Sequence, residues 1–222
     1  MNLILLFLSV IAGYGLGLLF QKKEIKNTSI ILAFSGAFLL SVTLFELLPE
    51  VFEQPSKELG LLVMIGILLQ IILDFFSKGA EHGHVHLDSG NLHFPWLLFL
   101  SLSIHSLIEG APAAANDSIL LGVLVHKVPI ALILTFFFLN AGYSNLKTFA
   151  FLFMFALMTP IGSFLSSEVS FLKFYQNEIN AVAIGIFLHV STTILFESSK
   201  DHKFNLAKLT AIVLAVIFAY FV

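Results

Sequence analysis

The sequence predicts an all-α protein, a polytopic bundle of eight transmembrane helices. Hydrophobic residues make up 58% of the 222 residues, and charged residues make up only 11%. A soluble domain has about 25% charged residues, so this chain lacks the polar surface that an aqueous fold needs. The apolar residues also form long runs that are separated by short polar connections. Runs of this length are typical of helices that cross a bilayer.

Each predicted span is close to the roughly 20 residues that a transmembrane helix needs. Residues 2–20 contain no charged side chain, and the first lysines follow this run instead of preceding it. A signal peptide has the opposite order, so we expect a retained first helix. Residues 29–52 and 59–77 come next and are divided by the turn-forming sequence EQPSK. The remaining spans are predicted at residues 93–115, 118–140, 147–166, 178–197 and 204–222.

The lysines predict how the chain lies across the membrane, because cytoplasmic connections carry an excess of basic residues. If the first helix starts outside the cytoplasm, the opposite side holds only Lys57 and Lys173, and Lys127 lies within a span. We therefore expect an integral protein of a bacterial inner (cytoplasmic) membrane, with both termini outside the cytoplasm. The cytoplasmic side then holds Lys22, Lys23, Lys26, Lys78, Lys147, Lys200, Lys203 and Lys208.

Two of the predicted spans resemble each other. Residues 35–50 read SGAFLLSVTLFELLPE, and residues 183–198 read AIGIFLHVSTTILFES. Both contain Gly-x-Phe-Leu and later Leu-Phe-Glu, and the two spans run in opposite directions. The pattern predicts an inverted repeat of helices 1–3 and 6–8 around helices 4–5, which is a common plan of transporters. Chance similarity between apolar helices is the alternative.

Polar residues within the fourth and fifth spans predict a metal site. His105 and Glu109 are four residues apart, so they share one helix face. A carboxylate in the membrane interior costs several kcal/mol unless it has a partner. The short connection NDS makes the next span a neighbour, and His126 on it lies at a depth similar to that of Glu109. Two imidazoles and a carboxylate suit Zn²⁺ and, less selectively, Fe²⁺, Mn²⁺ or Cd²⁺. A structural hydrogen bond between the helices is the alternative.

Further polar residues lie outside this group. Glu46 and Glu50 near the outer end of the second span are candidates for an entrance, and His189 and Glu197 on the seventh span are candidates for an exit path. Interfacial or structural roles are the alternatives for these four. Gln70 and Asp74 on the third span share a helix face, and we expect them to serve packing or an interface.

The third connection is rich in histidine. Residues 78–92 are predicted to form a cytoplasmic loop in which His82, His84 and His86 alternate with other residues. Alternating histidines can capture metal ions loosely. A merely polar loop is the alternative.

The motifs HSLIEG at 105–110 and HKVP at 126–129 resemble the metal-binding helices of the ZIP (Zrt/Irt-like) divalent metal transporters. The sequences TPIG at 159–162 and LLPE at 47–50 resemble weaker motifs of the same family. The resemblance covers the number and orientation of the spans and the histidine-rich connection. It implies that residues 1–222 form one transmembrane transporter domain, a homodimer in many members, that moves divalent cations towards the cytoplasm.

The chain departs from the family pattern at three positions. Members with a two-metal site place polar ligands where this chain has Ser106 and Lys127, and a further ligand where it has Ile130. The resemblance therefore implies one surviving site, built from His105, Glu109 and His126. We interpret Lys127 as a charge substitute for a second metal, and the alternative is a lysine that reaches outward to the lipid headgroups.

Three classes of function remain open from the sequence. The first is a zinc or other divalent-metal transporter that is not an enzyme, whose partners are the metal ion and the lipid bilayer and which needs no cofactor besides its cargo. The second is an intramembrane zinc-dependent hydrolase, in which the same residues would activate water. The third is a non-transporting metal sensor or scaffold. The net charge of −3 argues against a nucleic-acid partner.

Overall fold

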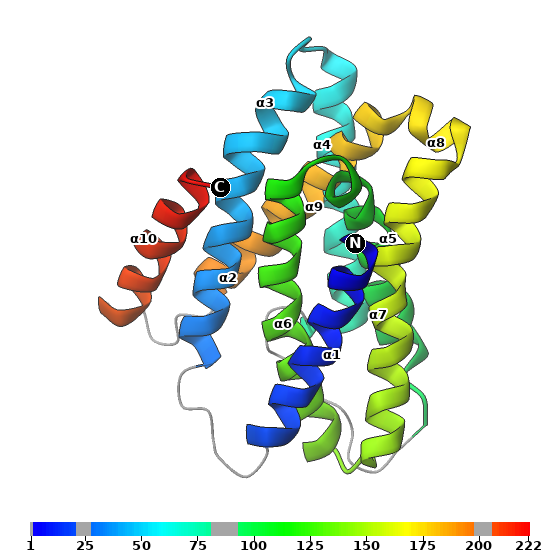
Figure 1. Ribbon diagram of the computed structural model, residues 1–222, viewed down its shortest axis with the longest axis vertical. Coiled ribbons are helices and arrows are strands. Elements are labelled where there is room, and N and C mark those ends of the chain that lie inside the picture. The colour runs from blue at the N-terminus through cyan, green and yellow to red at the C-terminus, as the bar shows by residue number, and fades with distance from the viewer. Residues whose placement is uncertain (1, 21–27, 81–92, 198–205) are drawn as a thin grey trace.

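The computed structural model describes residues 2–20, 28–80, 93–197 and 206–222 (Figure 1). Within these ranges every regular element is a helix, and the predicted all-α bundle is confirmed. Seven helical segments are long and apolar enough to cross a membrane, and a shorter apolar helix follows them. The elements are α1 (Asn2–Phe20), α2 (Thr28–Val42), η1 (Thr43–Leu47), α3 (Leu48–Val51), α4 (Lys57–Ser77), α5 (Trp96–Ala115), α6 (Asp117–Asn140), α7 (Asn145–Glu168), α8 (Ser170–Phe174), α9 (Gln176–Glu197) and α10 (Leu206–Tyr220).

Side-chain caps explain where several of these helices begin. Ser56 accepts a hydrogen bond from the backbone N–H of Leu59 and starts α4, and Ser144 starts α7 in the same way. Asn116 accepts from two backbone N–H groups at the start of α6. These side chains satisfy donors that the first turn of a helix leaves without an intrahelical partner. The short connections that the sequence predicts are therefore fixed by polar residues at the membrane surfaces.

The second predicted span is not a uniform α-helix. Residues Thr43–Leu47 form a π-helical turn between α2 and α3, and Pro49 lies in the first turn of α3. Proline has no N–H to donate and clashes with the carbonyl four residues earlier, and a wider π-turn relieves such a conflict. The turn carries Glu46, which is half-buried. Short π-helical turns are frequent at functional sites.

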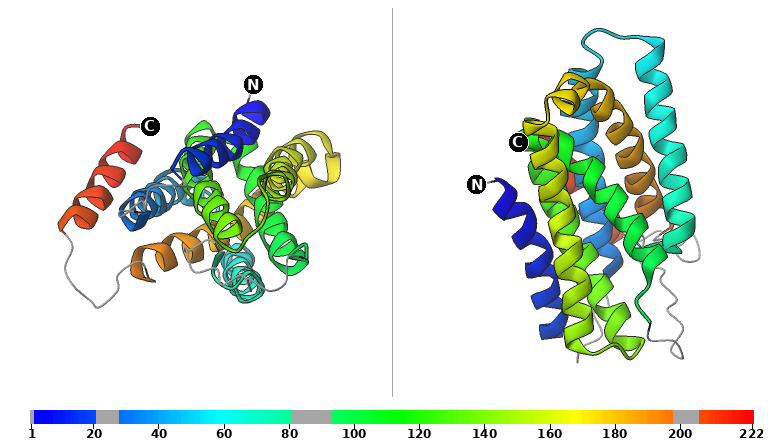
Figure 2. Two further views of the ribbon diagram at one scale, coloured as in Figure 1. Left: turned by 90° about the horizontal axis from the view of Figure 1, so that it is seen from below. Right: turned by 90° about the vertical axis from the view of Figure 1, so that its right-hand side faces the viewer.

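The helices form two groups that meet at the centre of the bundle. In one group α7 packs closely on α5, and α1 packs on both α6 and α7. In the other group α4 packs on α9, and α10 packs on α2. The groups join where α2 contacts α6 and where α5 contacts α4 and α9. Seen from one end, α10 lies at one edge of the bundle beside α2, and α4 lies beside α5 (Figure 2).

The outer surface of the bundle is apolar. Along α4, large hydrophobic side chains such as Leu61, Leu68 and Phe75 are exposed, and Phe171 and Phe174 are exposed on α8. Such a surface would be unstable in water but is the one that contacts lipid in a membrane. Together with the lengths of the helices, this surface describes an integral membrane protein. The buried polar side chains at its centre therefore require an explanation.

Candidate functional site at the centre of the bundle

His105 and Glu109 lie on one face of α5 in the interior of the protein. The exposed fraction is 2% for His105 and 0% for Glu109. His105 Nε2 is 3.1 Å from Glu109 Oε2, which is the one-turn contact that the spacing predicts. Neither side chain reaches water in this conformation, so the partners of the carboxylate must come from the protein.

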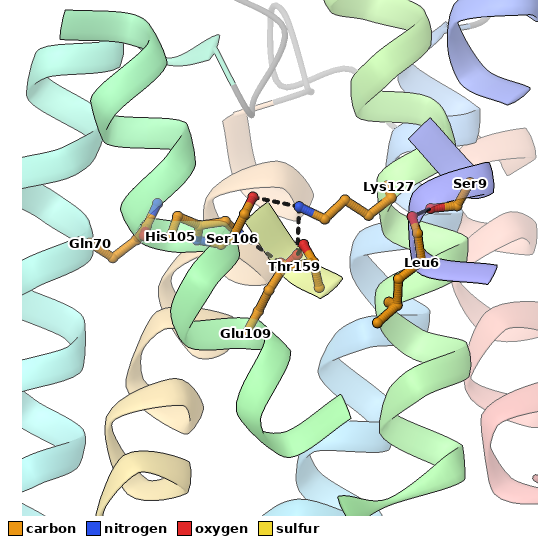
Figure 3. Close-up of polar contacts among 8 residues, drawn as sticks. All are labelled: Leu6, Ser9, Gln70, His105, Ser106, Glu109, Lys127 and Thr159. Atoms are coloured by element: carbon orange, nitrogen blue, oxygen red, sulfur yellow. Dashed lines mark hydrogen bonds and ion pairs between the residues drawn. The ribbon is translucent and has the colours of Figure 1, made fainter. Parts of the chain in front are cut away.

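Two neighbouring helices supply these partners. Lys127 of α6 places its Nζ 2.5 Å from Glu109 Oε1, and the hydroxyl of Thr159 in α7 donates a hydrogen bond of 2.8 Å to the same oxygen (Figure 3). A buried carboxylate is tolerated when it is paired and hydrogen-bonded in this way. The contacts join α5, α6 and α7 around a single carboxylate.

Lys127 points into the protein and not outward to the lipid headgroups. Its exposed fraction is 2%, and its ammonium also donates a hydrogen bond of 2.6 Å to Ser106 Oγ. The Nζ atom lies 4.4 Å from the centroid of the Phe155 ring, a cation–π distance. Figure 3 shows the lysine reaching from α6 to Ser106 and Glu109 on α5. Of the two placements considered for this lysine, the structure therefore has the internal one.

Gln70 of α4 contacts the other side of the His105 ring. Its Oε1 is 3.0 Å from Nδ1, and Gln70 is 1% exposed. An amide oxygen only accepts hydrogen bonds, so this contact is a hydrogen bond when Nδ1 carries a hydrogen. The imidazole then presents Nε2 to Glu109. The site thus draws on four helices, with α4 as a member that the sequence did not predict.

Glycines let α5 and α7 approach closely enough for Thr159 to reach Glu109. A Cβ atom at Gly162 would lie 2.0 Å from the carbonyl oxygen of Leu107, and a Cβ atom at Gly110 would lie 2.4 Å from that of Thr159. No side chain fits at such distances, so the contact requires glycine on both helices. Gly162 lies three residues after Thr159, and Gly110 directly follows Glu109.

His126 is buried on α6 but does not complete a metal site in this conformation. Its exposed fraction is 2%, and it directly precedes Lys127. Among the residues that the structure describes, no three His, Asp or Glu side chains are grouped as metal ligands. Lys127 meets the carboxylate from the side of α6. The structure therefore brings together His105 and Glu109 but does not add His126, and the three-ligand site stays a prediction.

The candidates for an entrance lie near one end of the bundle. Glu46 is half-buried in the π-helical turn, and Glu50 is exposed and accepts a hydrogen bond of 3.1 Å from the side chain of Asn116. This contact places the second span beside the connection between α5 and α6. Both glutamates therefore lie towards the end of the bundle at which α5 ends and α6 begins.

The exit candidates lie on α9, and the loop candidates lie in the connection between α4 and α5. His189 is half-buried near the middle of α9, and its carbonyl oxygen accepts hydrogen bonds from the hydroxyls of Thr192 and Thr193. Glu197 is the last residue of α9, and its side chain lies outside the described parts. The predicted loop histidines His82, His84 and His86 also lie outside the described residues. Both paths stay predictions.

Sequence reasoning missed two residues of the central cluster. The sequence indicates Thr159 only as part of the TPIG motif, and it predicts a packing or interface role for Gln70. A signal existed for Gln70, because a glutamine in the middle of an apolar span needs a buried partner. Nothing in the linear sequence pairs it with His105, which is 35 positions away.

Residues 81–221 match the family whose description is ZIP zinc transporter. The chain belongs to the ZIP family. The matched range contains His105, Glu109, Lys127 and Thr159, whereas Gln70 precedes it.

Three curated proteins are similar to parts of the chain. Protein zntD of Dictyostelium discoideum is 30% identical over an alignment of 150 residues, which covers 58% of this chain and 22% of that protein. Zinc transporter ZIP1 of Takifugu rubripes is 30% identical over 122 residues, covering 49% of this chain and 40% of the relative. Zinc transporter ZIP1 of Danio rerio is 27% identical over 127 residues, covering 51% and 42%. The chain therefore spans less than half the length of each relative.

Proposed function

We propose that this chain transports a divalent metal cation, zinc foremost, across a membrane towards the cytoplasm. Residues 1–222 act as one transporter domain in this proposal, and the ion passes a site on the fourth and fifth spans, α5 and α6. The observation that carries the proposal is the buried His105–Glu109 pair in a chain of the ZIP family. Fe²⁺, Mn²⁺ and Cd²⁺ are the alternative cargoes, since the same ligand types bind them.

The atoms of this pair are spaced as ligands of one ion would be. Metal–ligand bonds of about 2.0–2.2 Å at a tetrahedral angle separate two ligand atoms by roughly 3.3 Å. His105 Nε2 and Glu109 Oε2 are 3.1 Å apart. With the hydrogen on Nδ1, the lone pair of Nε2 faces a carboxylate oxygen, and two acceptors in contact need a cation between them. A proton serves when the site is empty, and the metal takes its place when the ion binds.

His126 is the third ligand in this proposal. It occupies the same turn of α6 as Lys127, which already contacts Glu109. Because His126 is not grouped with the other two ligands here, the proposal requires His126 to move towards them when the ion binds, by rotation of its side chain or by a shift of α6. Pro129 lies within α6 and weakens its backbone hydrogen bonding three residues after His126. Such a break makes a local adjustment of the helix less costly.

Lys127 supplies a permanent positive charge where relatives with two metals would bind a second ion. Its ammonium already contacts Glu109 and Ser106, and Ile130, at the further ligand position, is apolar and only 2% exposed. A chain with this arrangement binds one metal ion within the membrane. Metal analysis after deletion of residues 81–92 tests the stoichiometry. The combined change Lys127→Asp and Ile130→Glu is then expected to add a second bound ion.

Polar residues on two other spans form the path of the ion in this proposal. Glu46 and Glu50 attract cations at the entrance, and His189 and Glu197 receive the ion on its way out. His82, His84 and His86 capture metal loosely on the cytoplasmic side.

In this proposal the protein lies in a bacterial inner membrane with both termini outside the cytoplasm. It works as a homodimer.

An inverted repeat of helices 1–3 and 6–8 completes the proposed architecture. Such a repeat relates α1 to α7, α2 to α9, α4 to α10 and α5 to α6. The packing of α1 on α6 then corresponds to that of α7 on α5, and the packing of α4 on α9 corresponds to that of α10 on α2. All four packings occur. Gly13 approaches the carbonyl of Val128 as Gly162 approaches that of Leu107. Leu107 and Val128 each follow a histidine of the proposed site by two residues. These matching contacts support the proposed repeat.

Uptake of radioactive zinc into proteoliposomes, with a panel of competing cations, tests the function. We expect uptake by the wild-type protein and its loss in Glu109→Ala, His105→Ala and His126→Ala, each at normal abundance and with an unchanged elution profile. Normal uptake by Glu109→Ala would remove this site from the mechanism. Metal binding without uptake in the wild type would favour the sensor or scaffold, and hydrolysis of a membrane substrate would favour the enzyme.

A further inference from the structure

Gln70 lies on a helix outside the group that holds Glu109. Its helix, α4, packs mainly on α9, and the two backbones approach at Gly66 and Gly185, where an added Cβ would lie 2.1 Å from a carbonyl oxygen of the other helix. This close crossing is one turn before Gln70. The backbone that carries the glutamine is therefore held firmly, and its buried amide is presented to α5 from a fixed direction.

The contact with His105 determines which ring nitrogen is available. Gln70 Oε1 is 3.0 Å from Nδ1, so the amide oxygen accepts the Nδ1 hydrogen. Nε2 is thereby left to face Glu109 Oε2 at 3.1 Å. A histidine ligand binds a metal only through a nitrogen without hydrogen, and its other ring N–H is normally held by a second group.

We propose that Gln70 is a positioning residue of the metal site, which acts by holding His105 as the tautomer with its hydrogen on Nδ1. This inference rests on the proposed function, since it concerns how His105 binds the ion. Gln70 does not contact the metal. It fixes the orientation and tautomer of a ligand, and it does so from α4, a helix that supplies no ligand of the predicted set.

The neutral amide also suits the charges around the site. Glu109 and Lys127 form a buried pair of opposite charges, and a neutral acceptor leaves their sum unchanged. A carboxylate at position 70 would still accept the Nδ1 hydrogen, but it would add a negative charge and make the imidazole a stronger ligand. We therefore expect Gln70→Glu to bind the ion more tightly and to release it more slowly, whereas Gln70→Leu removes the acceptor and weakens binding.

Two measurements on purified full-length protein test this role. Calorimetric titration with Zn²⁺ is expected to show binding weaker by about 10–100-fold in Gln70→Leu. Gln70→Glu should match or exceed the wild-type affinity and have a lower maximal uptake rate. Gln176→Leu is the matched control, because Gln176 is a partly buried glutamine that bonds to Ala111 and Asn180 and not to His105. Its Zn²⁺ affinity should equal that of the wild type.

The second measurement reads the tautomer without any metal. Nitrogen NMR of isotopically labelled histidine should show a hydrogen on Nδ1 of wild-type His105. The His105 signal is assigned by its disappearance in His105→Ala. In Gln70→Leu the signal should shift towards the other tautomer. A wild-type Nδ1 without hydrogen, or an unchanged tautomer and affinity in Gln70→Leu, would overturn the role of Gln70, and the wild-type spectrum decides the point even if the variant fails to fold.

The two proposals fail in different ways. If Zn²⁺ binding is lost in His105→Ala but unchanged in Gln70→Leu, the positioning role is wrong and the metal site stands. If the wild type neither binds nor takes up metal, while the tautomer of His105 depends on Gln70, the transport proposal is wrong and the contact still orients the ring.

Discussion

The ion pair between Glu109 and Lys127 is the most consequential contact at the scale of single residues. Both side chains are almost completely buried, and the ammonium is held by the carboxylate, by Ser106 and by the ring of Phe155. Removing one partner of such a pair typically costs about 3–5 kcal/mol, because the other charge is left in a medium of low polarity. The pair therefore gives the carboxylate a counter-charge inside the membrane.

Replacing the lysine should separate its electrostatic role from its packing role. In Lys127→Met the side chain keeps much of its length but has no charge, so Glu109 takes up a proton that competes with the metal. We expect weaker Zn²⁺ retention at neutral pH, with partial recovery as the pH rises, measured by equilibrium dialysis. Lys208→Met is the control, because Lys208 is also buried but donates to the carbonyl of Leu195. Unchanged affinity and pH dependence in Lys127→Met would reduce Lys127 to a packing residue.

Thr159 should matter through its hydroxyl. Thr159→Val removes the hydrogen bond to the Glu109 carboxylate, and a bond to a charged group is worth about 1.5–3 kcal/mol. We expect a lower free energy of unfolding in detergent and a several-fold lower rate of zinc uptake. Thr148→Val on the same helix loses only a bond to the carbonyl of Ser144, so it should lower stability slightly and leave uptake intact. Equal uptake in the two variants would contradict a role of Thr159 at the site.

The residues of the site were predictable to the extent that their contacts are local in sequence. His105 and Glu109 meet because they are one turn apart on a helix, and the spacing alone predicts this contact. The contacts of Glu109 with Lys127 and Thr159, and of His105 with Gln70, join different helices. Their geometry depends on how each helix is rotated about its axis, and an apolar helix surrounded by lipid and protein gives a weak signal for that rotation.

At the scale of elements, glycine contacts decide which helices meet. The crossing of α5 and α7 at Gly110 and Gly162 brings Thr159 to the site, and the crossing of α4 and α9 at Gly66 and Gly185 holds the helix of Gln70. In a membrane, helices associate through close packing of small residues, since lipid provides no hydrophobic force between them. The position of the site thus depends on residues that have no polar side chain.

A methyl group at the first crossing should disturb the site without changing its chemistry. In Gly162→Ala the new Cβ would lie 2.0 Å from the carbonyl of Leu107, so α5 and α7 must separate. Such overpacking costs about 1–3 kcal/mol, and we expect lower thermal stability together with lower zinc uptake. Gly60→Ala on α4 is the control, because nothing lies within 4 Å of its added Cβ. A helical alanine there should be neutral or stabilising by about 0.5–1 kcal/mol. Equal changes of thermal stability and zinc uptake in the two variants would contradict a role of the crossing of α5 and α7 in positioning the site.

The elements themselves were largely predictable, because long apolar runs between polar connections leave few alternatives in a membrane. The predicted first span, 2–20, coincides with α1, and the predicted fifth span, 118–140, differs from α6 by one residue. The prediction of a uniform helix over 29–52 was incomplete, since Thr43–Leu47 forms a π-helical turn. Hydropathy cannot distinguish this turn from an α-helix, although Pro49 marks the place where the backbone must adjust.

At the scale of the whole molecule, contacts at the two ends describe which connections lie together. At one end the side chain of Asn116 donates to Glu50, so the connection between α5 and α6 lies beside α3. At the other end the hydroxyl of Tyr143 donates to the carbonyl of His93, so the connection between α6 and α7 lies beside the start of α5. The helices α5, α6 and α7 therefore run alternately in opposite directions, as Figure 1 shows. The ends are thus defined, and the uneven distribution of the lysines predicts which one faces the cytoplasm.

Cysteine labelling can test that orientation, because the chain has no cysteine of its own. Gln54 in the connection between α3 and α4 and Asn145 at the start of α7 are both exposed. This connection and the start of α7 lie at opposite ends of the bundle (Figure 1). If the lysine-rich end faces the cytoplasm, a membrane-impermeant maleimide added to intact cells should label Gln54→Cys and not Asn145→Cys. Both variants should react once the membrane is permeabilised, which shows that each thiol is accessible. Labelling of Asn145→Cys alone in intact cells would show that the protein has the opposite orientation. An ion moving towards the cytoplasm would then pass His105 and Glu109 before it reached Glu46 and Glu50.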